Sequence, residues 1–144
     1  MLSRRSLIIA GPVMAGMGVA LAATAQGRGS DQDRAKASTA VNPVKPTTDS
    51  VAAGKRLYDR NCSPCHGAGG HGDGKMAAQL DPKPASLIAG PFKHGSSDGD
   101  LYKTIRDGSK GTAMKGFGGR LSAEEIWNLV NYLRTLAPAP SNPR

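Results

Sequence analysis

Aromatic residues are scarce in this sequence of 144 residues, which contains two Phe, three Tyr and one Trp. All six lie after residue 50, so a folded unit is expected to begin near that point. A chain of that remaining length builds a marginal core unless a metal, a crosslink or a cofactor contributes. The sequence therefore predicts that a group other than its own side chains fills part of the core.

Cysteine is rarer still. The two cysteines exclude a framework of several disulfides and a four-cysteine zinc site. Alternating strand patterns and internal repeats are also absent, whereas 19 Gly and 10 Pro indicate long loops. The formal charge of +8 suits docking onto an acidic partner or simple solubility. The sequence contains no run of basic residues that would indicate binding to nucleic acid.

An uncharged stretch covers residues 7–25, shortly after Arg4 and Arg5. It ends in Ala23 and Ala25, at the −3 and −1 positions of a potential cleavage site. This pattern is typical of a secretory signal peptide, here residues 1–25, and predicts a protein exported to the periplasm. A retained membrane anchor is the alternative, because the stretch approaches the ~20 residues needed to cross a bilayer.

Residues 26–49 contain no aromatic side chain and only two valines. Such a segment buries too little apolar surface to order itself. We expect a disordered linker there, followed by one domain over residues 50–144.

Three helices are expected in that domain, and it should be all-α. Ser50 is a suitable N-cap for a helix that ends near Asn61. A short helix should run from Asp98 or Gly99 to residue 106. The last helix begins with an S-x-x-E capping box at residues 122–125, and its apolar residues recur at helical spacing as far as a proline at 138.

The sequence Cys62-Ser-Pro-Cys65-His66 fits the attachment pattern of c-type haem. Two thiols at this spacing match the two vinyl groups on one porphyrin edge, and the next residue brings an imidazole to the iron. Covalent attachment would hold haem in a domain too small to trap it by packing. The expected cofactor is therefore one haem c, bound through Cys62 and Cys65 and ligated by His66.

Three other interpretations of the cysteines remain open at this point, and one is that they are structural and match the haem pattern by chance. A disulfide or thioredoxin-like redox pair uses the same spacing, but normally in a βαβ context that is absent. A zinc site would need Cys62, Cys65 and two of the three histidines, which are His66, His71 and His94.

The second axial ligand is expected to be Met114. It lies in a glycine-rich segment beyond the short helix, which can carry the chain to the other face of the ring. Met76, His71, His94 and an open site are the alternatives. A His/Met pair raises the reduction potential relative to two histidines, which suits an electron carrier.

Together these segments resemble the class I monohaem c-type cytochromes. The resemblance covers about residues 50–137 and rests on Gly54-Lys-x-Leu-Tyr58, the haem motif, Gly72-Asp-Gly74, Gly111-Thr-Ala-Met114 and Leu121-Ser-x-Glu-Glu-Ile-Trp127. It implies a class I cytochrome c fold with crossing terminal helices, one covalently bound haem and long glycine- and proline-rich loops. It also implies that Gly54 and Tyr58 pack against Tyr132, and that the carbonyl of Pro84, or else Pro82, accepts the second ring N–H of His66.

The function implied by the resemblance is that of a periplasmic single-electron carrier, which is not an enzyme. Its partners would be redox proteins, a donor dehydrogenase or reductase and an acceptor oxidase. Two alternatives stay open: a cytochrome c subunit tethered to a larger dehydrogenase or oxidase, and a five-coordinate haem enzyme or sensor.

Overall fold

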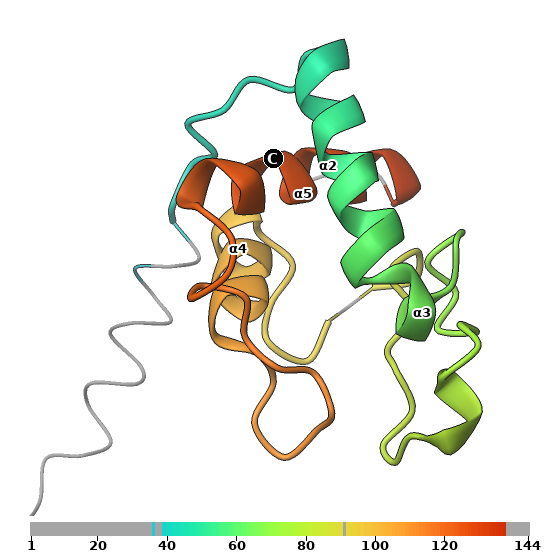
Figure 1. Cartoon of the computed structure of the whole chain (residues 1–144). Coiled ribbons are helices and arrows are strands. Elements are labelled where there is room, and N and C mark those ends of the chain that lie inside the picture. Colours follow the sequence, from blue (N-terminus) through green and yellow to red (C-terminus); the bar gives the residue numbers. More distant parts are fainter. Residues whose placement is uncertain (1–35, 37–38, 91, 138–144) are drawn as a thin grey trace, which may run out of the picture.

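The structure is a computed structural model that describes residues 36, 39–90 and 92–137. Its helices are α2 (Thr48–Asn61), α3 (Ser63–His66), the 3-10 turn η1 (Ala77–Gln79), α4 (Asp98–Asp107) and α5 (Ala123–Leu136) (Figure 1). No strand occurs among these residues, so the expected all-α class is confirmed. The expected signal peptide, residues 1–25, lies outside the described residues. None of the helices in the described part of the chain is long and apolar enough to span a bilayer.

The core forms where α2 crosses α5 (Figure 1). These helices lie near the N-terminal and C-terminal ends of the domain in the sequence. Gly54 permits this crossing, because a Cβ there would lie 2.0 Å from the backbone oxygen of Asn128. Beside it, the rings of Tyr58 and Tyr132 meet with centroids 5.2 Å apart. The packing that the family resemblance implied is therefore present. The buried apolar side chains of this core are Leu57, Tyr58, Leu101, Ile105, Ile126, Trp127, Leu129, Val130 and Tyr132.

Two helices begin as the sequence predicts. Ser97 caps α4, and Ser122 caps α5 in a capping box with Glu125. In each case the hydroxyl accepts a hydrogen bond from a backbone N–H of the first turn, and a carboxylate accepts the N–H of the cap. Tyr102 of α4 stacks on Trp127 of α5 with ring centroids 4.2 Å apart, which fixes the two helices against each other.

The expected N-cap of α2 was wrong. Thr47, not Ser50, caps the helix, and its hydroxyl accepts the N–H of Ser50. Ser50 itself lies within the helix and is buried, and its hydroxyl accepts a 2.7 Å hydrogen bond from Asn131 of α5. The Ser50 hydroxyl therefore links α2 to α5 and does not cap the helix.

The expectation that the whole of residues 26–49 forms a disordered linker was also wrong for its last part. Residues 39–47 lead into α2 and contact α5 (Figure 1). Asn42 donates a 2.7 Å hydrogen bond to Asn131, and Asn131 donates a 3.0 Å bond to the carbonyl of Val44. Amide hydrogen bonds and one packed valine therefore order this stretch despite its low apolar content. The ordered domain begins before residue 50.

Candidate haem-binding site

The two cysteines and the histidine of the motif lie at a sharp junction between helices. Cys62 is at once the C-cap of α2 and the N-cap of α3, a helix of a single turn that ends at His66. The N–H groups of Cys65 and His66 both bond to the carbonyl of Cys62, at 3.1 and 2.9 Å. This turn gathers the two thiols and the imidazole within five residues.

His66 is held in one tautomer by a backbone carbonyl. Its Nδ1 lies 3.0 Å from the oxygen of Ala85. A carbonyl only accepts hydrogen bonds, so Nδ1 carries the proton and the lone pair is on Nε2. Burial lowers the pKa of His66, while the bond to Ala85 opposes that shift. The neutral ring with a free Nε2 is the form that binds a metal.

We expected the carbonyl of Pro84, or else that of Pro82, to accept the second ring N–H of His66. This prediction was wrong, because the acceptor is the carbonyl of Ala85, one residue after Pro84. The Pro84 oxygen instead faces Gly72, where a Cβ would lie 2.5 Å from it. Successive carbonyl groups point in different directions in this non-helical segment, so the group that reaches His66 is that of Ala85.

The loop that follows α3 folds back onto it. The N–H groups of Gly72, Gly74 and Met76 donate to the carbonyls of His66, Cys65 and Pro64, at 2.8, 3.1 and 2.9 Å. These bonds satisfy the carbonyls left free at the end of a helix. They also tie residues 72–76 to the same side of the domain as the haem motif.

Tyr58 completes the support of this loop. Its hydroxyl donates a 2.6 Å hydrogen bond to the carbonyl of Gly67, the C-cap of α3. Burial is the main reason that the pKa of Tyr58 is raised, so the hydroxyl keeps its proton and remains a donor. The core of the helix crossing is thereby connected directly to the end of the haem motif.

The two methionines in the described part of the chain lie in different surroundings. Met76 belongs to the loop tied to α3, and the residue is 44% exposed. Met114 is half-buried and lies in the loop between α4 and α5, which is on the opposite side of the lower half of the molecule from α3 (Figure 1). Of these two methionines, only Met114 is partly buried and belongs to a loop that lies away from α3 and the haem motif.

The other two histidines are occupied or exposed. His71 is exposed, within the loop that is bonded to α3. His94 is hydrogen-bonded through Nε2 to the hydroxyl of Ser109, at 2.9 Å. Neither arrangement favours a role as the second axial ligand.

The alternative chemistries of the cysteines find little support in this geometry. Cys62 and Cys65 are free thiols, and burial, followed by the proximity of Cys65, raises the pKa of Cys62 to about 12. Redox-active pairs require the opposite, a lowered thiol pKa. Within residues 36, 39–90 and 92–137, no three His, Cys, Asp or Glu side chains come together as a metal site.

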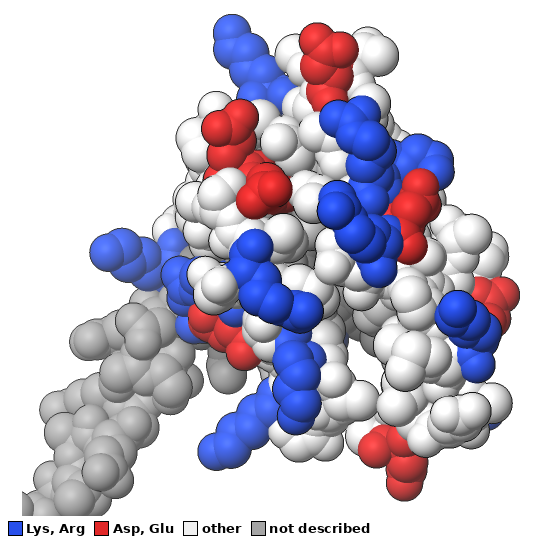
Figure 2. Space-filling view, viewed as in Figure 1, with Lys and Arg blue, Asp and Glu red and all other residues white. Residues whose placement is uncertain are grey.

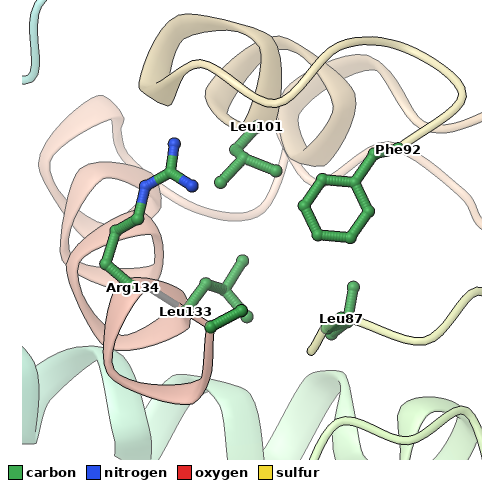
Figure 3. Close-up of a pocket in the computed structure, with 6 residues that line it drawn as sticks. Leu87, Phe92, Leu101, Leu133 and Arg134 are labelled. Carbon is green, nitrogen blue, oxygen red and sulfur yellow. The ribbon is translucent and has the colours of Figure 1, made fainter. Parts of the chain in front are cut away.

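Apolar side chains are left partly uncovered in the segment after Ala85. Figure 3 shows Leu87 and Phe92 facing Leu101 of α4 and Leu133 of α5 across a pocket with Arg134 at its rim. The empty volume of this pocket, about 210 Å³, includes open solvent. The segment therefore presents apolar surface of the kind that a covalently held cofactor would cover. The donor set of two thiols and a neutral imidazole is likewise the one that haem c requires.

The family comparison covers most of the folded domain. Residues 49–133 match the family described as cytochrome C oxidase, cbb3-type, subunit III. The matched range includes both cysteines, His66 and Met114.

Curated relatives point to the same group of proteins. The chain is 33% identical over 94 residues to the Cbb3-type cytochrome c oxidase subunit CcoP of Azospirillum brasilense, covering 64% of this chain but 31% of that protein. It is 32% identical over 81 residues to cytochrome c6 of Gracilaria tenuistipitata, covering 56% of this chain and 68% of that protein. The chain thus spans about a third of the length of its oxidase relative and most of the small cytochrome.

Solved structures agree on the fold. The reducing HAO-like protein complex of Kuenenia stuttgartiensis contains a chain that superposes with a TM-score of 0.62 at 37% identity, over 66% of this chain and 47% of that one. Cytochrome CL of Methylophaga aminisulfidivorans, at 22% identity and a TM-score of 0.53 over 67% of this chain and 57% of that one, supports the fold alone. With the helix crossing and the haem motif, these matches establish that the chain belongs to the family of the cbb3-type cytochrome c oxidase subunit III domain and is a c-type cytochrome of the class I fold with haem c as its cofactor.

Proposed function

We propose that this protein is a single-electron carrier whose one haem c is attached through Cys62 and Cys65 and ligated by His66 and Met114. The observation that carries the proposal is the His66–Ala85 hydrogen bond, which puts the ring proton on Nδ1 and leaves the lone pair on Nε2, in the residue directly after Cys65. When bound, the haem iron accepts and releases one electron without transforming a substrate. The roles of the chain are to attach, orient and enclose that group.

Met114 is preferred over Met76 because of how the two loops are fixed. The backbone of Met76 is bonded to Pro64 within the haem motif, so its loop lies on the His66 side. Met114 belongs to a separate loop and is half-buried. A thioether opposite the imidazole raises the reduction potential, which suits a carrier between two redox proteins.

The charge distribution supports an acidic docking partner. Residues 103–120 carry five basic side chains against one acid, whereas residues 67–90 carry two of each sign. In Figure 2 blue side chains gather over α4 and the loop below it. The basic residues of this region are Lys103, Arg106, Lys110, Lys115 and Arg120. Such a surface speeds the encounter with a negatively charged redox protein.

The location that suits this role is the periplasm, after export by residues 1–25. A second candidate is that the chain works as the cytochrome subunit of a larger dehydrogenase or oxidase. The similarity to an oxidase subunit and to a chain of an HAO-like complex favours it. Native purification with sizing distinguishes the two, because a free carrier elutes as a small species and a subunit elutes with its complex.

The ligand assignment is tested by paired substitutions in the haem-loaded protein. Met114→Ala should lower the reduction potential, abolish the weak far-red band of a ferric iron–thioether bond and allow the ferrous protein to bind carbon monoxide. Met76→Ala is the matched control and should change none of these. The reverse pattern would move the ligand to Met76, and carbon monoxide binding by the unmodified ferrous protein at neutral pH would favour the five-coordinate enzyme or sensor.

A further inference from the structure

The loop that holds Met114 is closed at its base by backbone contacts. Gly108 and Lys115 form an antiparallel bridge, and the N–H of Ser109 donates a 3.0 Å hydrogen bond to the carbonyl of Met114. A Cβ at Gly108 would lie 2.7 Å from that same carbonyl, which shows how closely the two arms approach. The position of the Met114 carbonyl therefore depends on Ser109.

A side chain within the loop holds the other backbone group of Met114. The hydroxyl of Thr112 accepts the N–H of Met114 at 3.1 Å and donates to the carbonyl of Ser109 at 2.8 Å. Both backbone groups of the residue proposed as ligand are thus connected to Ser109, one directly and one through Thr112.

Ser109 is in turn held from a different part of the chain. His94 precedes α4, and its Nε2 is hydrogen-bonded to the Ser109 hydroxyl at 2.9 Å. The turn that carries His94 is itself fixed, since the N–H of Gly95 donates to the carbonyl of Phe92 and the N–H of Phe92 donates to the hydroxyl of Ser96. A partly buried imidazole on an anchored turn is a firm attachment point for a glycine-rich loop.

We propose that His94 is a positioning residue for Met114, which acts through Ser109 to keep the thioether loop closed. The inference rests on the proposed function, because it takes Met114 as the axial ligand. Without the bond to His94, Ser109 keeps its backbone hydrogen bond to Met114, but its hydroxyl loses the partner that holds the loop to the turn before α4. The loop should then open more often, and the iron–thioether bond should break more often with it.

The test measures how fast imidazole binds to the ferric haem-loaded protein, because this ligand enters when the thioether leaves. His94→Ala should raise the binding rate about three- to tenfold, the factor expected for losing one net hydrogen bond, and should weaken the far-red band. His94→Gln keeps a side-chain amide near Ser109 and should restore most of the parent rate. His71→Ala, at an exposed histidine, is the matched control and should bind imidazole at the parent rate.

Ser109→Ala provides a second route to the same conclusion if His94→Ala fails to fold. It should raise the rate by a similar factor, and the double variant should add nothing further, because both changes remove one interaction. A rate within twofold of the parent in His94→Ala, or additive effects of the two changes, would overturn the inference. The far-red band separates a failure of this inference from a failure of the proposed function. If the parent protein lacks the band, the proposed Met114 ligation fails. If the parent has the band and Met114→Ala loses it, the imidazole rates test the role of His94 alone.

Discussion

Replacing Gly54 with alanine tests the crossing of α2 and α5 that supports the haem motif. A Cβ at this position would lie 2.0 Å from the backbone oxygen of Asn128 and 2.9 Å from the Cβ of Tyr132. Ordinary contacts of a Cβ begin near 3.4 Å, so one helix must move by about 1.4 Å relative to the other. A backbone carbonyl cannot rotate away as a flexible side chain does.

The expected cost follows from these distances. Overpacking a core costs typically about 1–3 kcal/mol, and a clash with backbone belongs at the upper end of that range. Alanine recovers up to about 1 kcal/mol through its higher helix propensity. We therefore expect Gly54→Ala to lower the free energy of unfolding by about 2 kcal/mol, which corresponds to a melting temperature lower by about 8–16 °C in a domain of this size.

The assay is thermal and chemical unfolding of the haem-loaded protein, followed by far-ultraviolet circular dichroism. Gly119→Ala is the control, because a Cβ there would meet no atom within 4 Å. It should leave the melting temperature within a degree or two of the parent. If Gly54→Ala proves as stable as the parent or more stable, the close crossing described above is incorrect.

Three further changes probe other contacts of the domain. Asn131→Ala should cost about 2–3 kcal/mol, because it removes the partner of the buried Ser50 hydroxyl and of the partly buried Val44 carbonyl, and faster amide exchange in residues 39–47 should accompany it; unchanged exchange there would contradict the anchoring role. Ser122→Ala removes the N-cap of α5 and should cost about 1 kcal/mol in urea unfolding, whereas an unchanged midpoint would show that the cap is not used. The hydrogen-bonded guanidinium of Arg106, with Lys103, lowers the pKa of Asp107 from its ordinary 3.8 to about 2. The Asp107 carboxylate therefore stabilises the fold above about pH 4, and this contribution is lost as the pH falls towards 2. Asp107→Asn should cost about 0.5 kcal/mol at pH 7, since the pair is exposed, and the difference should vanish near pH 2; a difference that persists there would refute the assignment.

Local sequence signals predicted much of the fold. The capping box of Ser122 and Glu125 predicted the start of α5, and α4 begins at Asp98, one of the two starts expected for it. The haem motif is equally local, since its spacing is set by the porphyrin edge. The family resemblance predicted the close crossing at Gly54, because a residue without a Cβ permits two helices to approach closely.

The polar contacts between residues far apart in the sequence could not be predicted. The carbonyl that orients His66 belongs to Ala85, and a backbone group has no residue type that would identify it. Asn42 lies in a segment of low apolar content, yet it is ordered by an amide partner 89 residues away. The same holds for His94 and Ser109, which become neighbours only when the chain has folded.

The central claim is a covalently bound haem with His66 and Met114 as ligands. It is tested most directly by visible spectra of the mature protein, oxidised and reduced, before and after extraction with acidified acetone. The account predicts sharp c-type bands that stay with the protein after extraction, together with the weak far-red band of a ferric iron–thioether bond. Haem that is retained without that band would contradict the Met114 assignment. Haem that leaves with the solvent would contradict attachment through Cys62 and Cys65.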